Sequence, residues 1–187
     1  MEILAIVVLL FLILLLSAMA AFTVCLLWAS FFTKVPFVPF PKALLSEVAK
    51  VLELNENSKL YDLGCGDGRV LIECHKSQPG ARYVGIEKDI IPIVCAKIKL
   101  SKIKKPHTIS ILRKNFFKQN ISDATHIFVY LSPGMMDALL PKLEKELVPG
   151  TRLVTCDFAF SQKEPARIIN FDRSAKSRGK RLLVYEF

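Results

Sequence analysis

Three glycines at alternate positions carry the main chemical signal of this chain. Gly64, Gly66 and Gly68 follow a strand-like stretch with the apolar residues Leu60, Tyr61 and Leu63, and an apolar, helix-like stretch begins at Val70. A strand that turns sharply into a helix through glycines brings bare backbone amides and a helix N-terminus close to a ligand. The segment therefore predicts a binding loop between a strand and a helix.

An acidic side chain 21 residues beyond Gly66 extends this prediction. Glu87 closes a second expected strand that includes residues 83–86. A carboxylate at that distance from a glycine loop is placed to hold the two hydroxyls of a ribose. Loop and carboxylate together predict a nucleoside-binding α/β site.

The spacing of the glycines indicates which nucleoside is bound. A dinucleotide fingerprint requires G-x-G-x-x-G, but here Gly68 arrives one residue early and Arg69 stands where the third glycine belongs. Asp62, two positions before the first glycine, suits a cation or an amine better than a phosphate. The pattern resembles the first two motifs of class I S-adenosylmethionine-dependent methyltransferases. The alternative, a turn that only joins a strand to a helix, does not need all of these residues.

The resemblance implies S-adenosyl-L-methionine as the cofactor and assigns residues to its parts. The glycine loop is expected to hold the methionine moiety and Glu87 the ribose. After the third strand, Asn115 stands where an Asp usually meets the adenine, and its amide can still form a hydrogen bond with the exocyclic amine. Phe116 either stacks on the ring or belongs to the core. The predicted cofactor residues are Asp62, Gly64, Cys65, Gly66, Asp67, Gly68, Glu87, Asn115 and Phe116.

The segment after the fourth strand is expected to face the methyl acceptor. It contains Tyr130, Ser132 and Pro133, which we predict as the catalytic residues. Tyr130 and Ser132 offer oxygen atoms that can orient an attacking amine, although Tyr130 can instead complete the packing of its strand. Enzymes that methylate exocyclic base amines carry Asn/Asp-Pro-Pro-Tyr/Phe here. This chain does not, so nucleic acid is not the expected partner.

Alternating strands and helices must position these residues. The expected strands are 59–63, 82–87, 108–112, 125–131, 151–157, 167–171 and 181–187, and the expected helices are 42–54, 68–77, 90–101 and 135–147. Such alternation, with mostly apolar strands, implies a parallel sheet covered on both faces. The last two strands are expected to form an antiparallel hairpin, because the stretch 173–180 is too short for a helical crossover. The helix before that hairpin is shortened to a loop near 161–165. The predicted fold is a Rossmann-like class I methyltransferase sheet, preceded by one transmembrane helix.

The first 33 residues predict a membrane anchor. Residues 3–32 contain no charged side chain, and a helix of that length, about 45 Å, crosses a bilayer core. A cleaved signal ending at Ala20 is disfavoured, because Glu2 is acidic and the apolar run continues past that point. We expect an anchor at 1–33, a connector rich in proline at 34–41 and a methyltransferase domain at 42–187. The apolar residues among those prolines, such as Phe40, indicate packing against another surface as an alternative to a plain spacer.

Charge and cysteine usage predict the orientation of the domain. All 26 Lys and Arg residues lie beyond residue 33, against 16 acidic residues there, which gives this part a net charge of +10. By the positive-inside rule the domain faces the cytoplasm of a single-pass membrane protein. The five cysteines include no C-x-x-C pair, so neither a disulfide framework nor a metal site is predicted. The lipid bilayer, contacted through residues 3–32, is an expected partner.

Several segments together resemble a narrower family, the protein-lysine methyltransferases that act on the ATP synthase c subunit or the adenine nucleotide translocase, and their archaeal relatives. The resemblance covers residues 36–157 and rests on the connector, the glycine loop, Asn-Phe-Phe at 115–117, Tyr-Leu-x-Pro at 130–133 and the stretch 147–154. It implies a protein substrate, and the anchor makes a membrane-protein lysine the leading one. The chain departs from the family at Phe40, usually a small hydroxyl residue, at Cys65, often Ser, and at Asn115. A lipid or RNA substrate, or a tethered module without catalysis, remains an alternative.

Overall fold

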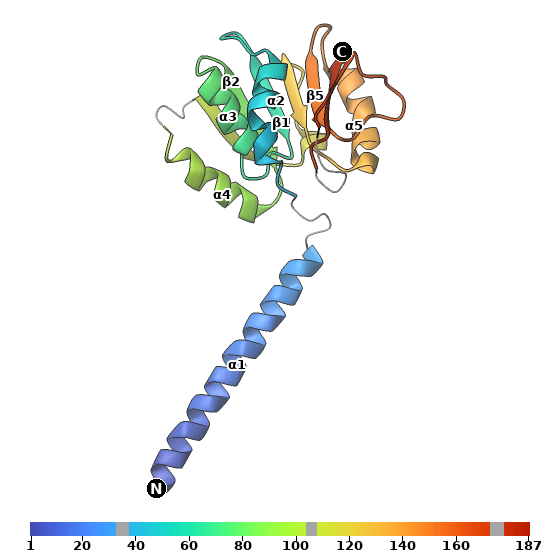
Figure 1. The fold of residues 1–187 in the computed structure, drawn as a ribbon. Coiled ribbons are helices and arrows are strands. Elements are labelled where there is room, and N and C mark those ends of the chain that lie inside the picture. Colours follow the sequence, from blue (N-terminus) through green and yellow to red (C-terminus); the bar gives the residue numbers. More distant parts are fainter. Residues whose placement is uncertain (33–37, 104–107, 173–177) are drawn as a thin grey trace. The chain divides into compact units, whose positions relative to one another are not determined.

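The computed structural model describes residues 1–32, 38–103, 108–172 and 178–187. The chain divides into two compact units, Met1–Phe37 and Val38–Phe187. Residues 34–37 of the expected connector lie outside the described residues. Each unit has its own architecture (Figure 1).

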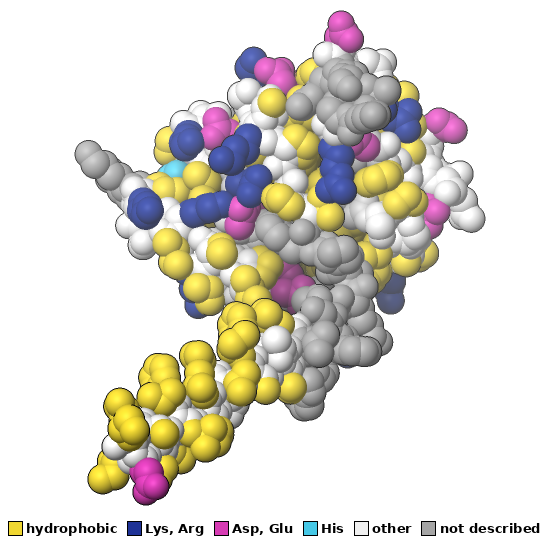
Figure 2. Space-filling model, turned by 60° about the horizontal axis from the view of Figure 1, so that its bottom comes forward, with side chains coloured by type: hydrophobic (Ala, Val, Ile, Leu, Met, Phe, Trp, Pro, Cys, Tyr) yellow, Lys and Arg dark blue, Asp and Glu magenta, His cyan; other side chains and the backbone are white. Residues whose placement is uncertain are grey.

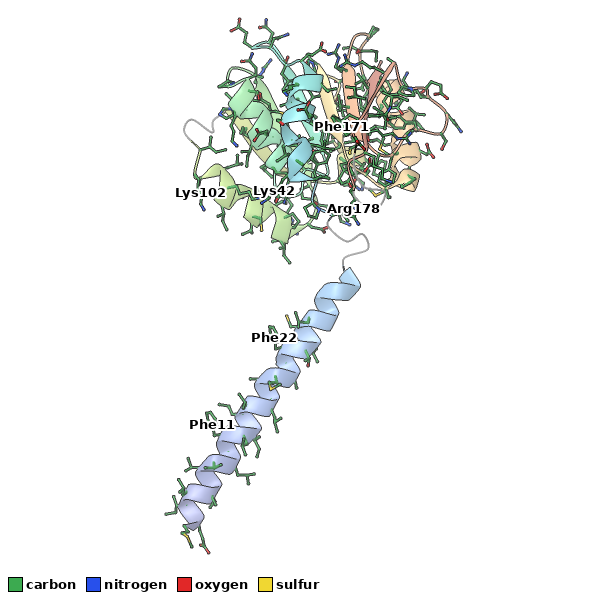
Figure 3. All side chains as sticks on the ribbon, viewed as in Figure 1. Phe11, Phe22, Lys42, Lys102, Phe171 and Arg178 are labelled. Carbon is green, nitrogen blue, oxygen red and sulfur yellow. The ribbon has the colours of Figure 1, made fainter. Side chains whose placement is uncertain are left out.

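The first unit contains a single long helix, α1, at Glu2–Phe32. Its stretch Glu2–Leu26 is long and apolar enough to cross a membrane, judged by length and composition. The described side chains of this stretch are exposed, among them Phe11 and Phe22 (Figure 3). A hydrophobic helix that buries nothing against protein needs an apolar environment of another kind, or is a signal sequence.

The second unit is built on a seven-stranded sheet with the order β3-β2-β1-β4-β5-β7-β6. The first five strands run parallel, whereas β7 pairs antiparallel with both β5 and β6. This arrangement confirms the predicted fold class, including the C-terminal hairpin. The strands are β1 Lys59–Leu63, β2 Arg82–Glu87, β3 Ile109–Arg113, β4 His126–Val129, β5 Arg152–Cys156, β6 Arg167–Asn170 and β7 Arg181–Glu186.

The helices of this unit are η1 Lys42–Leu44, α2 Leu45–Leu52, α3 Arg69–Ser77, α4 Ile90–Leu100, η3 Phe116–Lys118 and α5 Pro133–Glu146. Residues 157–166, all of them described, form no helix, as the sequence predicted. The first predicted helix is shorter than expected. It begins as a 3₁₀ turn and ends at Leu52, because Glu53 takes a left-handed backbone conformation with φ 52°.

Two buried clusters hold the sheet between its helices (Figure 1). On one face α2 and α3 contribute fully buried side chains such as Leu52 and Leu71. On the other face α5 contributes Met136 and Leu139. The apolar strands read in the sequence are thus covered from both sides, as parallel strands require.

Strands β4 and β5 both stop earlier than predicted, at the edge where the candidate site lies. The pairing of β1 with β4 ends at Leu63 and Val129, and the chain then turns into α5, whose first residue is Pro133. Strand β5 ends at Cys156 because Asp157 adopts a left-handed φ of 63°. Since β2 and β4 flank β1 on opposite sides, this edge is a topological switch point, where open α/β sheets bind ligands.

Candidate active site

The glycine loop after β1 uses backbone conformations that other residues adopt only under strain. Gly64, Gly66 and Gly68 have φ values of 83°, 54° and 70°. The amides of Gly64 and Cys65 both donate to the carbonyl of Ile86, at 2.8 and 3.1 Å, and so fold the loop back onto β2. The three glycines are thus required by the turn itself.

A fourth glycine, which the sequence reasoning missed, makes room for this loop. A Cβ atom on Gly85 would lie 2.7 Å from Cys65 Sγ, Leu71 Cδ1 and Ile111 Cδ1. The Cys65 thiol is therefore packed against β2, and burial raises its pKa. Cys65 contributes to the site by packing and through its backbone. The available signal in the sequence was Gly85 itself, because a glycine between apolar residues of a strand often marks a close approach of another segment.

Glu87, the predicted ribose ligand, lies against the glycine loop. Its Oε2 accepts a hydrogen bond from the amide of Gly66 at 3.0 Å. Its Oε1 accepts from the amides of Lys88 and Asp89, at 2.7 and 3.0 Å. These three amides fix the carboxylate at the end of β2, and the half-buried side chain remains accessible. The structure thus joins the two motifs that the sequence separates.

Asp62 and Asp67 lie close to Glu87 but differ in their partners. The buried carboxylate of Asp62 has no hydrogen-bond partner among the described residues. Burial, followed by the charges of Glu87 and Asp67, raises its pKa well above the usual range. Asp67 instead pairs with Arg69, at 2.5 Å between Oδ2 and Nη2, and with Lys99. Although burial opposes ionisation, hydrogen bonds from these two cations bring the pKa of Asp67 to about 2.

This arrangement fits S-adenosyl-L-methionine. The cations beside Asp67 balance its charge, whereas the raised pKa of Asp62 can be offset only by a cation bound beside it. An unpaired buried carboxylate is costly and favours a cationic ligand nearby. The cofactor carries an ammonium and a sulfonium, whereas the phosphates of a dinucleotide would be repelled. The residues present therefore suit a sulfonium nucleoside.

Asn115 and Phe116 follow β3, next in the sheet to the strand that ends at Glu87. The Asn115 Oδ1 accepts from the amide of Phe117 at 3.0 Å and so caps the short helix η3. Phe116 is half-buried and packs on the core cluster beneath α5. It also contacts Phe117, with ring centroids 4.6 Å apart. The structure thus supports the packing role of Phe116. Asn115 is exposed, and its side-chain oxygen is used in the helix cap.

An aromatic group surrounds Tyr130 at the end of β4. The rings of Phe40 and Tyr130 meet edge to face at 5.3 Å, and Phe158 stacks on Tyr130 at 6.4 Å. The Tyr130 hydroxyl has no hydrogen-bond partner among the described residues, and burial raises its pKa. The sequence pointed to Tyr130 and to packing by Phe40, but it did not single out Phe158.

Ser132 and Pro133 start helix α5 and are exposed. The carbonyl of Ser132 accepts from the amides of Met135 and Met136, both at 3.0 Å. Pro133 occupies the first turn, where its missing N–H costs nothing. Both residues therefore lie beside Tyr130 along the chain and set the direction in which the helix leaves the sheet.

Arg69 connects the glycine loop to the start of the second unit. Its Nε donates to Asp67 Oδ1 at 2.8 Å, and its Nη1 donates to the carbonyl of Phe40 at 2.9 Å. The residue that replaces the third dinucleotide glycine thus holds Phe40 in place. Since Phe40 packs on Tyr130, one guanidinium bridges the cofactor loop and the aromatic group.

Asp157 is a further residue at this edge that the sequence did not reveal. Its carboxylate accepts from the amides of Gly179 and Lys180, both at 2.7 Å. A Cβ on Gly179, whose φ is 78°, would clash with Leu44 and lie 3.3 Å from Pro41. The strained Asp157 therefore holds the turn before β7 against the segment that carries Phe40.

Comparison with known proteins shows the same family over most of this unit. A family model described as the ANTKMT methyltransferase domain matches residues 62–167. A protein-lysine N-methyltransferase of Saccharolobus islandicus (strain REY15A) is 34% identical over 143 residues, which cover 76% of this chain and 89% of that protein. An adenine nucleotide translocase lysine N-methyltransferase of Mus musculus is 29% identical over 160 residues, 82% of this chain and 69% of its own length.

Solved structures agree on the fold. An RNA methyltransferase from Salinibacter ruber, in complex with S-adenosyl-L-homocysteine, has a TM-score of 0.73 and 30% identity, and the match covers 80% of this chain and 93% of that one. A precorrin-6y C5,15-methyltransferase from Geobacter metallireducens has a TM-score of 0.62 at 12% identity, covering 82% and 92%, and shows the fold alone. With the switch-point geometry and the family match in agreement, this chain belongs to the ANTKMT methyltransferase domain family.

Proposed function

We propose that this protein methylates the ε-amine of a lysine in a protein substrate, with S-adenosyl-L-methionine as the methyl donor. The observation that carries the proposal is the Tyr130 hydroxyl, which has no hydrogen-bond partner among the described residues and lies within an aromatic group, one strand away from the glycine loop. The relatives named as lysine N-methyltransferases support the substrate class.

The chemical difficulty is the protonation of lysine. With a pKa near 10.4, about one lysine in 2,500 is neutral at pH 7, so deprotonation costs roughly 4.6 kcal/mol. The cofactor supplies an electrophilic methyl group, and its positive charge disfavours an ammonium nearby. The rings of Phe40 and Phe158 cover part of Tyr130, and desolvation of this kind favours the neutral amine. No strong base is needed if the amine is held in line.

The roles of the site residues in this proposal follow from their places. Tyr130 orients the amine through its hydroxyl, while Ser132 and Pro133 shape the wall beside it. Glu87 holds the ribose, and Asp62 faces the cationic part of the cofactor. The backbone of residues 64–68 surrounds the methionine moiety, with the Asp67 and Cys65 side chains supporting the loop. Asn115 and Phe116 border the adenine.

We also propose a membrane location. The stretch Glu2–Leu26 has the length and composition of a span, and the concentration of Lys and Arg beyond residue 33 favours a cytoplasmic domain. In this proposal residues 1–33 are a single-pass anchor, 34–41 a connector and 42–187 the catalytic domain. A lysine near the bilayer surface, on a membrane or membrane-associated protein, is then the most accessible substrate.

The test is the fate of methyl label from S-adenosylmethionine. The full chain is incubated with membranes and cytosol, and label is measured separately in protein, lipid and nucleic acid. Methyl-lysine in hydrolysed protein, absent with the Glu87→Ala variant, supports the proposal. Label confined to lipid or nucleic acid would contradict the substrate class, and absence of label from all fractions would contradict catalysis.

RNA is the second candidate substrate. The Salinibacter ruber protein is named as an RNA methyltransferase, and this chain has a net charge of +9, which favours polyanions. Against RNA base amines stands the sequence Tyr-Leu-Ser-Pro at 130–133, which lacks the Asn/Asp-Pro-Pro-Tyr/Phe pattern. The nucleic-acid fraction of the same experiment decides between the two.

A further inference from the structure

Helix α4 has two apolar faces, although it packs on the sheet with only one. Ile93 and Ala96 are buried. On its other side Ile91, Val94 and Ile98 are 73%, 48% and 55% exposed. Their spacing of i, i+3 and i+7 places them along one stripe of the helix. We refer to these three residues as the outer stripe.

Lysines border the outer stripe. Lys97 and Lys99 lie on the same helix, and Lys102 follows its C-terminal end (Figure 3). Lys99 also pairs with Asp67, whereas Lys97 and Lys102 are exposed. Figure 2 shows hydrophobic side chains next to Lys and Arg on the face of the domain that comes forward there.

Single exposed apolar residues are ordinary on a soluble surface. Three aliphatic side chains in one helical stripe, bordered by lysines, are typical of a helix that lies in a membrane interface. The apolar side chains enter the boundary of the acyl chains, while lysines extend their amines to the headgroups. Each lysine near an anionic surface adds to the electrostatic attraction between the protein and the lipid, and salt weakens this attraction.

We propose that the outer stripe of α4 lies on the surface of an anionic lipid bilayer. Two observations favour lipid over a protein partner: the charge complementarity of the bordering lysines, and the presence in the same chain of a helix fit to span a membrane. The inference rests on the proposed membrane location. If the N-terminal helix anchors the chain, the contact of α4 with the same membrane is intramolecular, so that a weak affinity of α4 for lipid is enough to hold it there.

The consequence concerns the orientation of the active site. Helix α4 begins three residues after Glu87, and Lys99 pairs with Asp67 of the glycine loop. Contact of α4 with lipid therefore fixes the distance between the cofactor end of the site and the bilayer. Substrate lysines that lie at this same distance from the bilayer become the preferred acceptors.

Two exposed cysteines allow this to be tested on the full chain. Cys25 lies in α1 and Cys95 in α4, whereas Cys65, Cys74 and Cys156 are buried. An environment-sensitive fluorophore is attached to Cys95 in Cys25→Ser protein, and to Cys25 in Cys95→Ser protein. Both are reconstituted into vesicles of phosphatidylcholine, with or without phosphatidylglycerol. We expect the Cys95 probe to shift to shorter wavelength in the anionic vesicles and to revert at high salt.

Substitutions within the stripe give the matched comparison. Ile91→Ser with Ile98→Ser is expected to abolish the Cys95 shift, and Lys97→Glu to reduce it. Val148→Ser, at an apolar residue that is 51% exposed elsewhere, is the control and leaves the shift unchanged. Circular dichroism of each variant verifies that the fold is retained.

Each outcome decides one part of the inference. A lipid-exposed Cys25 probe with a water-exposed Cys95 probe would overturn the role of α4 and leave the anchor standing. A water-exposed Cys25 probe would remove the anchor itself, and the inference with it. A Cys95 shift that follows protein density rather than lipid charge would assign the stripe to a second copy of the chain. The methyl-label experiment is independent of all three outcomes.

Discussion

The two halves of the candidate site are built from different kinds of interaction. The cofactor half consists of backbone in left-handed conformations and of carboxylates held by amides, as at Gly66 and Glu87. The half that we propose for the acceptor, called the acceptor half below, consists of the aromatic side chains of Phe40, Tyr130 and Phe158, with Phe40 and Phe158 each packed on Tyr130. Backbone geometry suits a cofactor that stays the same whatever the substrate, whereas packed side chains can be exchanged to change the acceptor.

Arg69 is where the two halves meet. Its guanidinium holds Asp67 in the loop and the carbonyl of Phe40 in the acceptor half. Substitutions in the cofactor half should therefore lower cofactor affinity, and substitutions in the acceptor half should lower the rate of methyl transfer. Substitutions at Arg69 should lower both. The comparison can be tested on this basis.

The largest effect is expected from Glu87→Ala. The variant loses the proposed ribose ligand and the acceptor for three backbone amides, so cofactor affinity should fall about 100-fold or more. Isothermal titration calorimetry with S-adenosylmethionine measures this. Glu144→Ala, at an exposed position on α5, is the control. Unchanged affinity would remove Glu87 from the cofactor half.

The second-largest effect is expected from Gly85→Ala. Its Cβ has no room beside Cys65, Leu71 and Ile111, and overpacking costs about 1–3 kcal/mol. Thermal unfolding and cofactor affinity should both worsen, because the loop rests on this strand. Gly134→Ala provides the matched control, since its Cβ would meet nothing within 4 Å. Equal behaviour of the two variants would show that the loop does not depend on the close approach at Gly85.

Tyr130→Phe tests the acceptor half. The rate of methyl transfer is expected to fall about tenfold, the size of one lost hydrogen bond to the amine, while cofactor affinity stays unchanged. Tyr61→Phe is the control, because its hydroxyl bonds Asp123 away from this group. Single-turnover measurements separate the rate from binding. An unchanged rate would remove Tyr130 from catalysis.

Arg69→Met is expected to lower cofactor affinity and transfer rate together, each by several-fold, because both hydrogen-bonded links disappear. Arg69→Lys keeps a positive charge beside Asp67 but lacks the planar guanidinium that also reaches the carbonyl of Phe40. Compared with Arg69→Met, it should therefore recover cofactor affinity more than the rate of methyl transfer. If Arg69→Met changes cofactor affinity alone, the two halves are independent.

The smallest effect concerns acid stability. The pKa of Asp67 in the folded protein, about 2, is below the ordinary value of 3.8, so the folded state binds this proton less readily than the unfolded chain. Its stabilisation is therefore present above about pH 4 and is lost as the pH falls from 4 to 2. In thermal unfolding, Asp67→Asn should be less stable at neutral pH and lose less on acidification. Parallel pH profiles of the two proteins would contradict this.

The turn between β1 and α3 and its contact with Glu87 could be predicted because their signal is local. The glycines, Asp62 and Glu87 occupy two short segments, and glycine is the residue that adopts the left-handed positions of the turn without strain. The alternation of strands and helices likewise predicted the sheet and its terminal hairpin, because buried strands and amphipathic helices differ in period.

The acceptor half was predicted in part. Tyr130 follows a strand, so its position at the edge could be inferred. Phe158 and Asp157 follow β5, but nothing in the spacing shows that one ring stacks on Tyr130 or that the other residue holds Gly179. Contacts between segments that are distant in the sequence depend on side-chain packing, which periodicity does not encode.

The sequence by itself therefore determined the fold class, the cofactor loop and an apolar N-terminal helix, since each follows from residue types at short range. Only the tertiary structure decided the partners: Arg69 with Phe40, Asp62 with no paired cation within the described part of the chain, and an outer stripe on α4 that the sheet does not cover. These features depend on which surfaces meet once the chain is folded, and burial is a property of the whole packed unit.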